Sequence, residues 1–180
     1  MTGLYGGAFD PPHVGHVALA AGAKHAFGLP RLVVLVSERP GHKGTHAPPE
    51  VRLELARVAF PDDDVRLDPY PRTIDLLRAE RFETPLFVVG ADEFCHFLSW
   101  KEPDAILDLA ELGVGTRPGF SRDRLDTVLV QLRQPERVHF FEIPPSPASS
   151  TAIRGGGPVG ELVPPAVAAL IRQRGLYTEA

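Results

Sequence analysis

The sequence predicts an α/β fold in which an open, mainly parallel sheet carries helices on both faces. Two apolar runs, at 32–36 and 86–89, consist only of leucine, valine and phenylalanine, with no polar residue inside either run. Runs of this kind are buried on both faces and are typical of central strands in parallel sheets. A helical pattern of small and apolar residues at 14–27 precedes the first of these runs, and the short apolar run Leu4-Tyr5 precedes that helix. Strand and helix therefore alternate, which predicts right-handed βαβ units.

The first unit has the clearest pattern. The apolar pair Leu4-Tyr5 precedes Gly6-Gly7, and a helix is predicted from Val14 to Phe27. Glycines without a Cβ allow a sharp turn and a close approach of a ligand. The unpaired amides and the dipole of a helix start favour an anion. We therefore expect a phosphate site at the end of the first strand.

The other elements follow from the same reading. In chain order we expect a polar loop over 37–49, a helix from 48–50 to about 60, a strand over 65–67, a helix opening within 70–77, a helix over 103–109, a strand over 112–115, a helix over 121–132, a strand over 138–143 and a closing helix over 162–174. In the second helix, Val51, Leu55 and Val58 form the apolar stripe. Its charged residues are expected to face solvent, namely Arg52, Glu54 and Arg57.

Length and composition limit the class of protein. The 180 residues suit one domain over 1–180, and 43% hydrophobic with 23% charged residues is typical of soluble globular chains. The net charge of −4 without basic runs disfavours a general nucleic-acid binder, so a phosphate site must be local. The single Cys95, expected to pack in the core, excludes an internal disulfide and favours the cytoplasm. No membrane span and no signal peptide are expected.

A pair of histidines opens the first predicted helix. His13 and His16 are three residues apart and therefore lie on one face of the first turn, where imidazoles and free amides suit a polyphosphate. A zinc site of His13, His16 and Asp10 is the alternative. The stretch Gly6-Gly7-Ala8-Phe9-Asp10-Pro11-Pro12-His13-Val14-Gly15-His16 resembles the signature of the HxGH nucleotidyltransferases, G-G-x-F-D-P-x-H-x-G-H, at every fixed position.

Further segments resemble the nicotinate- and nicotinamide-mononucleotide adenylyltransferases of that superfamily. The loop Pro40-Gly41-His42-Lys43 resembles P-P-H-K, with Gly41 in place of proline. The segment 70–77 keeps Thr73, Asp75 and Leu77 of Y-T-x-D-T-L but has Arg72 for tyrosine and Leu76 for threonine. Thr73 is expected to cap this helix. Arg72 could contact a carboxylate on the substrate ring or could be solvated, so the choice between acid and amide stays open.

Three later segments complete the resemblance. Gly90, Asp92 and Trp100 resemble the G-x-D…W segment, and Arg117-Pro118-Gly119 resembles R-P-G. The stretch 146–154 resembles I-S-S-T-x-I-R, with Ala148 for isoleucine. Its residues also indicate a phosphate site by themselves, because Ser149 or Ser150 can cap a short helix and Arg154 can add a charge-assisted fork.

The resemblance implies a Rossmann-like fold and adenylyl transfer from ATP to nicotinate mononucleotide, giving deamido-NAD and pyrophosphate. The implied cofactor is Mg²⁺ bound with ATP, and the implied partners are ATP and a pyridine mononucleotide, with the oligomeric state open. Nicotinamide mononucleotide or dual specificity, phosphopantetheine adenylyl transfer and a non-catalytic nucleotide sensor are the alternatives. The implied catalytic residues are His13, His16, Lys43 and Arg154. The implied ATP-binding residues are Gly6, Gly7, Phe9, His13, His16, Arg117, Ser149, Ser150, Thr151 and Arg154. The implied substrate-binding residues are Asp10, Lys43, Thr73, Asp92 and Trp100.

Overall fold

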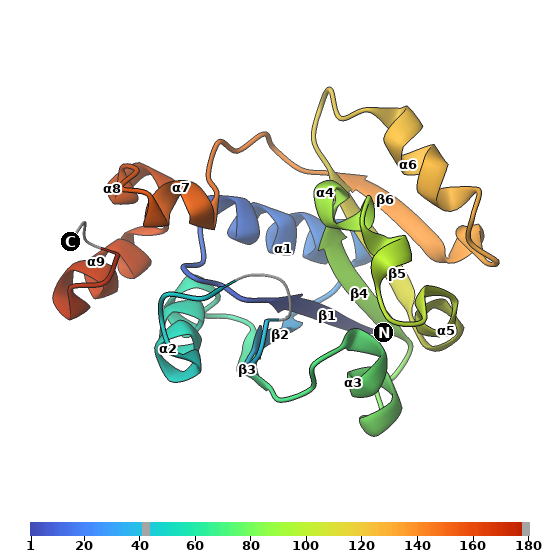
Figure 1. Cartoon of the computed structure of the whole chain (residues 1–180), viewed down its shortest axis with the longest axis horizontal. Helices are drawn as coiled ribbons and strands as arrows, with labels where there is room; N and C mark the ends of the chain where they lie inside the picture. The colour runs from blue at the N-terminus through green and yellow to red at the C-terminus, as the bar shows by residue number, and fades with distance from the viewer. Residues whose placement is uncertain (41–43, 178–180) are drawn as a thin grey trace.

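A computed structural model describes residues 1–40 and 44–177, and its centre is a parallel sheet (Figure 1). The strands are β1 (Thr2–Gly7), β2 (Leu32–Ser37), β3 (Asp64–Asp68), β4 (Pro85–Gly90), β5 (Glu111–Thr116) and β6 (Val138–Glu142). They lie in the order β3-β2-β1-β4-β5-β6, and every neighbouring pair is parallel. The expected Rossmann-like sheet is confirmed. Its strand order reverses between β1 and β4, where ligands bind in folds of this type.

Helices cover both faces of the sheet, as expected. The helices are α1 (Val14–Phe27), α2 (Pro49–Ala59), α3 (Thr73–Ala79), α4 (Ala91–Phe94), α5 (Pro103–Leu109), α6 (Arg122–Leu129), α7 (Ser150–Arg154), α8 (Val159–Leu162) and α9 (Pro165–Arg174), with 3₁₀ turns η1 (Phe97–Ser99) and η2 (Pro135–Arg137). One apolar core joins the sheet to α1, α2 and the C-terminal helices, and the other joins it to α3–α6. None of the helices in the described ranges is long and apolar enough to cross a membrane.

Central strands contribute side chains to both cores. Along β1, Leu4 belongs to the core beneath α3–α6, whereas the next residue, Tyr5, belongs to the core beneath α1 and α2. Leu35 and Val36 divide in the same way on β2. Burial on both faces removes the need for alternating polar residues, so these strands read as continuous apolar runs.

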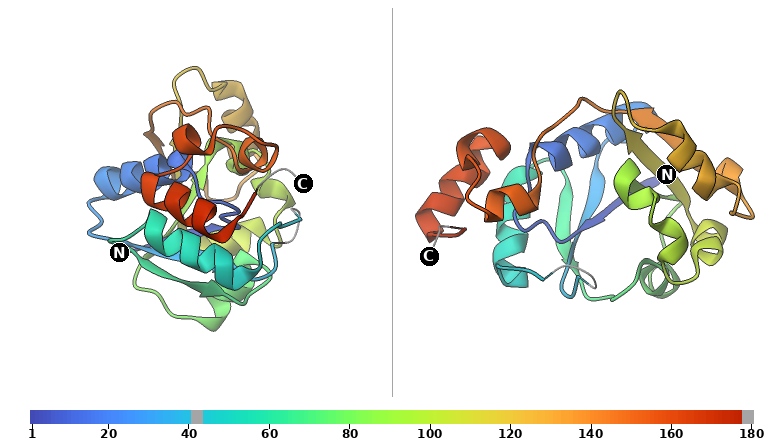
Figure 2. Two further views of the ribbon diagram at one scale, coloured as in Figure 1. Left: turned by 90° about the vertical axis from the view of Figure 1, so that its left-hand side faces the viewer. Right: turned by 45° about the horizontal axis from the view of Figure 1, so that its top comes forward.

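The closing helix begins a few residues later than expected. The helix expected over 162–174 is α9, which begins at Pro165 and has Gly175 just past its end, while the short α8 ends before it at Leu162. Prolines lack the amide hydrogen that a continuous helix needs. Helix α9 packs on α2, away from the sheet, as the left-hand view of Figure 2 shows. Arg174 and Glu54 form a 2.8 Å ion pair across this contact.

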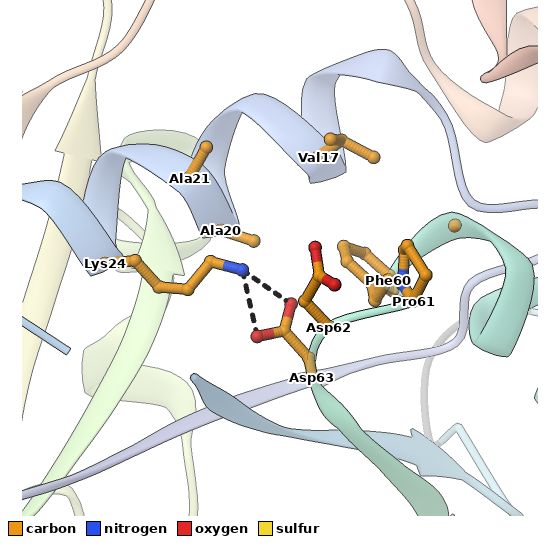
Figure 3. Close-up of a pocket in the computed structure, with 9 residues that line it drawn as sticks. Val17, Ala20, Ala21, Lys24, Phe60, Pro61, Asp62 and Asp63 are labelled. Atoms are coloured by element: carbon orange, nitrogen blue, oxygen red, sulfur yellow. Dashed lines mark hydrogen bonds and ion pairs between the residues drawn. The ribbon is translucent and has the colours of Figure 1, made fainter. Parts of the chain in front are cut away.

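A buried carboxylate ties α1 to the segment before β3. Asp63 accepts two hydrogen bonds of 2.9 Å from Lys24 Nζ, and its Oδ1 also accepts the Leu32 amide at 2.9 Å. Figure 3 shows the ion pair at the pocket between α1 and residues 59–63. The Asp63 side chain is only 2% exposed. It therefore joins helix, strand start and turn at one point.

Replacing Asp63 by alanine is expected to lower the free energy of unfolding by about 2–4 kcal/mol, because it leaves a half-buried ammonium and the start of β2 without their acceptor. Denaturant unfolding of the variant measures this loss. The exposed neighbour supplies the control, since Asp62→Ala should change stability by less than about 0.5 kcal/mol. Equal stability of both variants would contradict the assignment.

Candidate active site

The loop between β1 and α1 lies where the strand order reverses. Gly6 and Gly7 end β1, and both are needed for packing, since an added Cβ would lie 3.0 Å from the Phe87 ring at Gly6 and 2.9 Å from the Phe9 ring at Gly7. Phe9 itself is 1% exposed. Its ring packs edge-on against His16, with centroids 5.2 Å apart. A nucleotide could therefore contact only the backbone of Phe9, while the Phe9 ring packs against His16.

The two histidines cap the start of α1 for each other. The His16 amide donates to His13 Nδ1 at 3.3 Å, and the His13 amide donates to His16 Nδ1 at 3.1 Å. The rings stack with centroids 3.6 Å apart and an angle of 24°. Because each Nδ1 accepts a hydrogen bond, each neutral ring carries its proton on Nε2. The predicted common face is confirmed, and the capping fixes the tautomer of both rings.

Burial lowers the pKa of His13 to about 4, from an ordinary value of 6.5. Protonation would also place a hydrogen on Nδ1 and break the capping bond. The folded protein therefore holds a neutral imidazole at pH 7, which can donate one hydrogen bond from Nε2.

This lowered pKa makes stability depend on pH. Between pH 6.5 and 4 the unfolded chain binds a proton at His13 that the folded chain does not, so stability falls as the pH falls. We expect this group to reduce the free energy of unfolding by about 2 kcal/mol between pH 7 and pH 5. Denaturant unfolding at both pH values tests it. His13→Asn should flatten the dependence, and the exposed His25→Asn should leave it unchanged.

Side chains from distant elements hold the carbonyls of the loop before His13. Arg52 Nη1 donates to the Ala8 carbonyl at 2.7 Å, and Arg154 Nη1 donates to the Asp10 carbonyl at 2.7 Å. Ser150 Oγ donates to the Pro11 carbonyl at 3.0 Å. The two sequence motifs predicted to bind phosphate therefore lie side by side, and α7 braces the loop that leads to the histidines.

Helix α7 also has the expected cap. Ser149 Oγ accepts the Ala152 amide at 3.0 Å, so Ser149 is the capping residue of the two serines considered. Thr151 Oγ1 lies 3.5 Å from Arg154 Nη2, at the limit of a hydrogen bond. Arg154 is half-buried, and its Nη1 is bonded to the loop that leads to the histidines.

Arg52 does not face solvent, contrary to the expectation from the sequence. Its side chain is completely buried, and Nε donates to the Ala47 carbonyl at 3.1 Å in addition to the bond to Ala8. Burial lowers the pKa of Arg52, while the nearby Asp10 carboxylate acts in the opposite direction. Helical periodicity treats arginine as a surface residue, but here the nearby Ala47 carbonyl and the distant Ala8 carbonyl accept its hydrogen bonds and permit its burial.

The Asp10 carboxylate is engaged by the chain itself. It is 2% exposed, its Oδ2 accepts the His46 amide at 2.6 Å, and its Oδ1 accepts the Ala47 amide at 3.1 Å. Tyr177 Oη also donates to Oδ1, at 2.7 Å. These bonds, and the capping bonds on both Nδ1 atoms, disfavour the zinc alternative. Within the described ranges, no three histidine, cysteine, aspartate or glutamate side chains cluster as metal ligands.

A second group of predicted residues lies at the ends of β4 and β5. Arg117 Nη2 donates to Asp92 Oδ2 at 2.9 Å, and Arg117 Nη1 donates to the Ser146 carbonyl at 3.3 Å. A Cβ added at Gly15 would lie 3.3 Å from Ser146 Oγ, so Ser146 links this group to the first turn of α1. Ser146 therefore lies between the Arg117–Asp92 pair and the first turn of α1.

The remaining predicted residues lie in the other helical layer or outside the described ranges. Trp100 packs edge-on against Phe97 and Phe87, with centroids 5.4 and 6.0 Å apart, and is half-buried. Thr73 is the first residue of α3, and Arg72 occupies the capping position with no side-chain cap bond, so the expected Thr73 cap is wrong. The chain is still extended at Arg72, which moves the cap one residue back. Lys43 lies outside the described residues.

Sequence reasoning missed three residues of this site. Arg52 looked like a surface charge, Tyr177 closed a helix far along the chain, and Ser146 was one serine in a polar stretch. In sequence, Arg52 lies 44 residues from its partner Ala8, Tyr177 lies 167 residues from Asp10, and Ser146 lies 29 residues from Arg117. One feature of the sequence could have indicated the burial of Arg52, namely its place on the apolar side of a short helix.

Comparison with known proteins agrees with this geometry. Residues 4–156 match the model of the cytidylyltransferase-like family. A protein of Rubrobacter xylanophilus, named a probable nicotinate-nucleotide adenylyltransferase, is 35% identical over 98% of this chain and 91% of its own length. A protein of Thermus thermophilus with the same name is 36% identical over 97% of this chain and 98% of its own length.

A solved structure shares the fold. The Plasmodium falciparum nicotinic acid mononucleotide adenylyltransferase complexed with NaAD superimposes with a TM-score of 0.77 at 17% identity, over 98% of this chain and 96% of that one. The family match, the identity over nearly the whole length and the histidine turn at the switch point lead to one conclusion. The chain belongs to the cytidylyltransferase-like family, among its nicotinate-nucleotide adenylyltransferases.

Proposed function

We propose that the chain transfers the adenylyl group of ATP to nicotinate mononucleotide, giving deamido-NAD and pyrophosphate in NAD biosynthesis. One observation supports this most directly. Two stacked histidines, each with its proton on Nε2, lie at the point where the strand order reverses, and Arg154 is bonded to the Asp10 carbonyl three residues before His13. Neutral donors and a fixed cation at this place suit a polyphosphate whose charge increases at the leaving group.

The reaction needs no covalent intermediate with the protein. The 5′-phosphate oxygen of the mononucleotide attacks the α-phosphorus of ATP in line, and the bond from that phosphorus to the bridging oxygen of pyrophosphate breaks. His13 and His16 donate Nε2–H groups to the transferring and leaving phosphates. Arg154 and Lys43 hold the triphosphate, with Ser149, Ser150 and Thr151 at the start of α7. Catalysis then consists of positioning and charge stabilisation.

Mg²⁺ is the proposed metal, bound together with ATP. Mg²⁺ binds nucleotides mainly through phosphate oxygens and water, so it needs few protein ligands. The acidic groups near the site agree with this, because Asp10 accepts three hydrogen bonds from the chain and Asp92 is paired with Arg117. The ion would add positive charge at the leaving pyrophosphate, while the histidines and Arg154 orient it.

The pyridine nucleotide would lie toward β4 and β5. Asp92 is exposed and keeps acceptor sites beside its bond to Arg117, which suits ribose hydroxyls. Trp100 offers a ring for stacking the pyridine, and Thr73 begins the neighbouring helix. Arg117 would contact the adenylyl side. Asp10 would hold the loop before His13 in place rather than contact the substrate.

Pyrophosphate release with ATP and Mg²⁺ tests the function. Nicotinate mononucleotide, nicotinamide mononucleotide and phosphopantetheine are assayed side by side, and we expect turnover of the first well above the second. Comparable turnover of both pyridine nucleotides would show dual specificity, and turnover of phosphopantetheine alone would replace the assignment. Binding of ATP without turnover of any of them would identify a nucleotide sensor.

A further inference from the structure

A hydrogen bond joins the C-terminal segment to the loop before the histidines. Tyr177 Oη donates to Asp10 Oδ1 at 2.7 Å, across 167 residues of sequence. The same carboxylate accepts the amides of His46 and Ala47, at 2.6 and 3.1 Å. Asp10 lies three residues before His13, so three separate segments meet at the base of the histidine turn.

The backbone conformation of Tyr177 indicates that its surroundings hold this residue in place. Its φ is 56°, in the left-handed region that residues with a side chain rarely adopt, and it lies two residues after Gly175, the C-cap of α9, which has a φ of 61°. An unfavourable backbone conformation persists only where the surroundings fix it. Burial, reinforced by the Asp10 carboxylate, raises the pKa of the Tyr177 hydroxyl well above its ordinary value. The phenol therefore stays protonated and donates.

We infer that Tyr177 is a positioning residue for the adenylyl transfer, because its hydroxyl fixes Asp10 and through it the loop that ends at His13. This inference rests on the proposed function. The carbonyls of Ala8, Asp10 and Pro11 are held by other side chains. Tyr177 acts on the carboxylate instead, at the point where residues 46–47 meet the loop.

The C-terminal helix has other attachments, so the role of the hydroxyl can be separated from the packing of α9. Val167 and Ile171 of α9 are buried against the core, at 0% and 3% exposure. Arg174 pairs with Glu54 of α2. Removing one phenolic oxygen leaves these contacts in place, and its effect should fall on the loop and on the segment at 46–47.

The test compares Tyr177→Phe with Arg174→Gln, which loosens α9 without touching Asp10. For Tyr177→Phe we expect kcat for pyrophosphate release to fall about tenfold, since a mispositioned donor acts on the transition state, while KM for ATP stays within twofold. Hydrogen exchange at the amides of residues 46 and 47 should become faster. Arg174→Gln should keep kcat within twofold and leave this exchange unchanged.

Asp10→Asn supplies the second arm, because it removes the charged acceptor and keeps the shape. Adding Tyr177→Phe to Asp10→Asn should lower kcat by less than a further twofold, since the partner of the hydroxyl is already altered. A kcat of Tyr177→Phe within twofold of the unaltered protein overturns the inference. If the unaltered protein releases no pyrophosphate, the proposed function fails instead. Unchanged hydrogen exchange at the amides of residues 46 and 47 in Tyr177→Phe overturns the link between the hydroxyl and this segment.

Discussion

His16→Ala is expected to lower kcat for adenylyl transfer by about 10²-fold or more, the usual cost of losing one donor that acts on transition-state charge. The imidazole of His16 is held on three sides. It stacks on His13 at 3.6 Å, rests on the edge of Phe9 at 5.2 Å, and accepts the His13 amide at Nδ1. These contacts fix the orientation of the His16 ring, so its Nε2–H donor needs no reorganisation when charge develops.

The measurement is steady-state pyrophosphate release, with ATP affinity determined by calorimetry. A donor that acts mainly in the transition state should change kcat far more than ATP affinity. His25→Ala is the matched control, since His25 is an exposed histidine near the end of the same helix. A folded His16→Ala protein with kcat within threefold of the unaltered chain would remove His16 from the mechanism.

The order of elements was predictable because it depends on local patterns. Continuous apolar runs marked β2 and β4, and the glycine turn before Val14 marked the start of α1. The strand order β3-β2-β1-β4-β5-β6 was not predictable in this way, because it depends on which side of β1 the chain returns to after α3. A phosphate site at the end of the first strand was expected from the glycine turn, but that this strand end is the switch point between β1 and β4 is known only from the tertiary arrangement.

The candidate site was predictable where residues act through neighbours in sequence. The His13–His16 pair and the Ser149 cap are contacts within one helical turn, and both were expected. Arg52 was expected at the surface, and the partners of Asp10 were not foreseen, because their contacts depend on the tertiary fold. Arg52 is buried by carbonyls of residues 8 and 47, and Asp10 is covered by residues 46, 47 and 177. Composition and periodicity carry no information about such partners.

Arg154→Met is expected to lower kcat/KM for ATP by about 10²–10³-fold, because it removes a cation and a fork from the transferring phosphates. Arg154→Lys should restore at most about tenfold of this loss. Nη1 already donates to the Asp10 carbonyl at 2.7 Å, so the guanidinium holds the loop with one edge while another edge remains for phosphate. A lysine ammonium is a single point of charge on a flexible stem and cannot do both.

Initial rates of pyrophosphate release over a range of ATP concentrations separate these outcomes, and Arg172→Met, an exposed arginine of α9, is the control. Full recovery by lysine would show that Arg154 supplies charge alone and that its bond to the loop is incidental. Equal damage from lysine and methionine would show the opposite, that bracing the Asp10 carbonyl is the main role. Partial recovery is the expected result, because one side chain serves the loop and the phosphates at once.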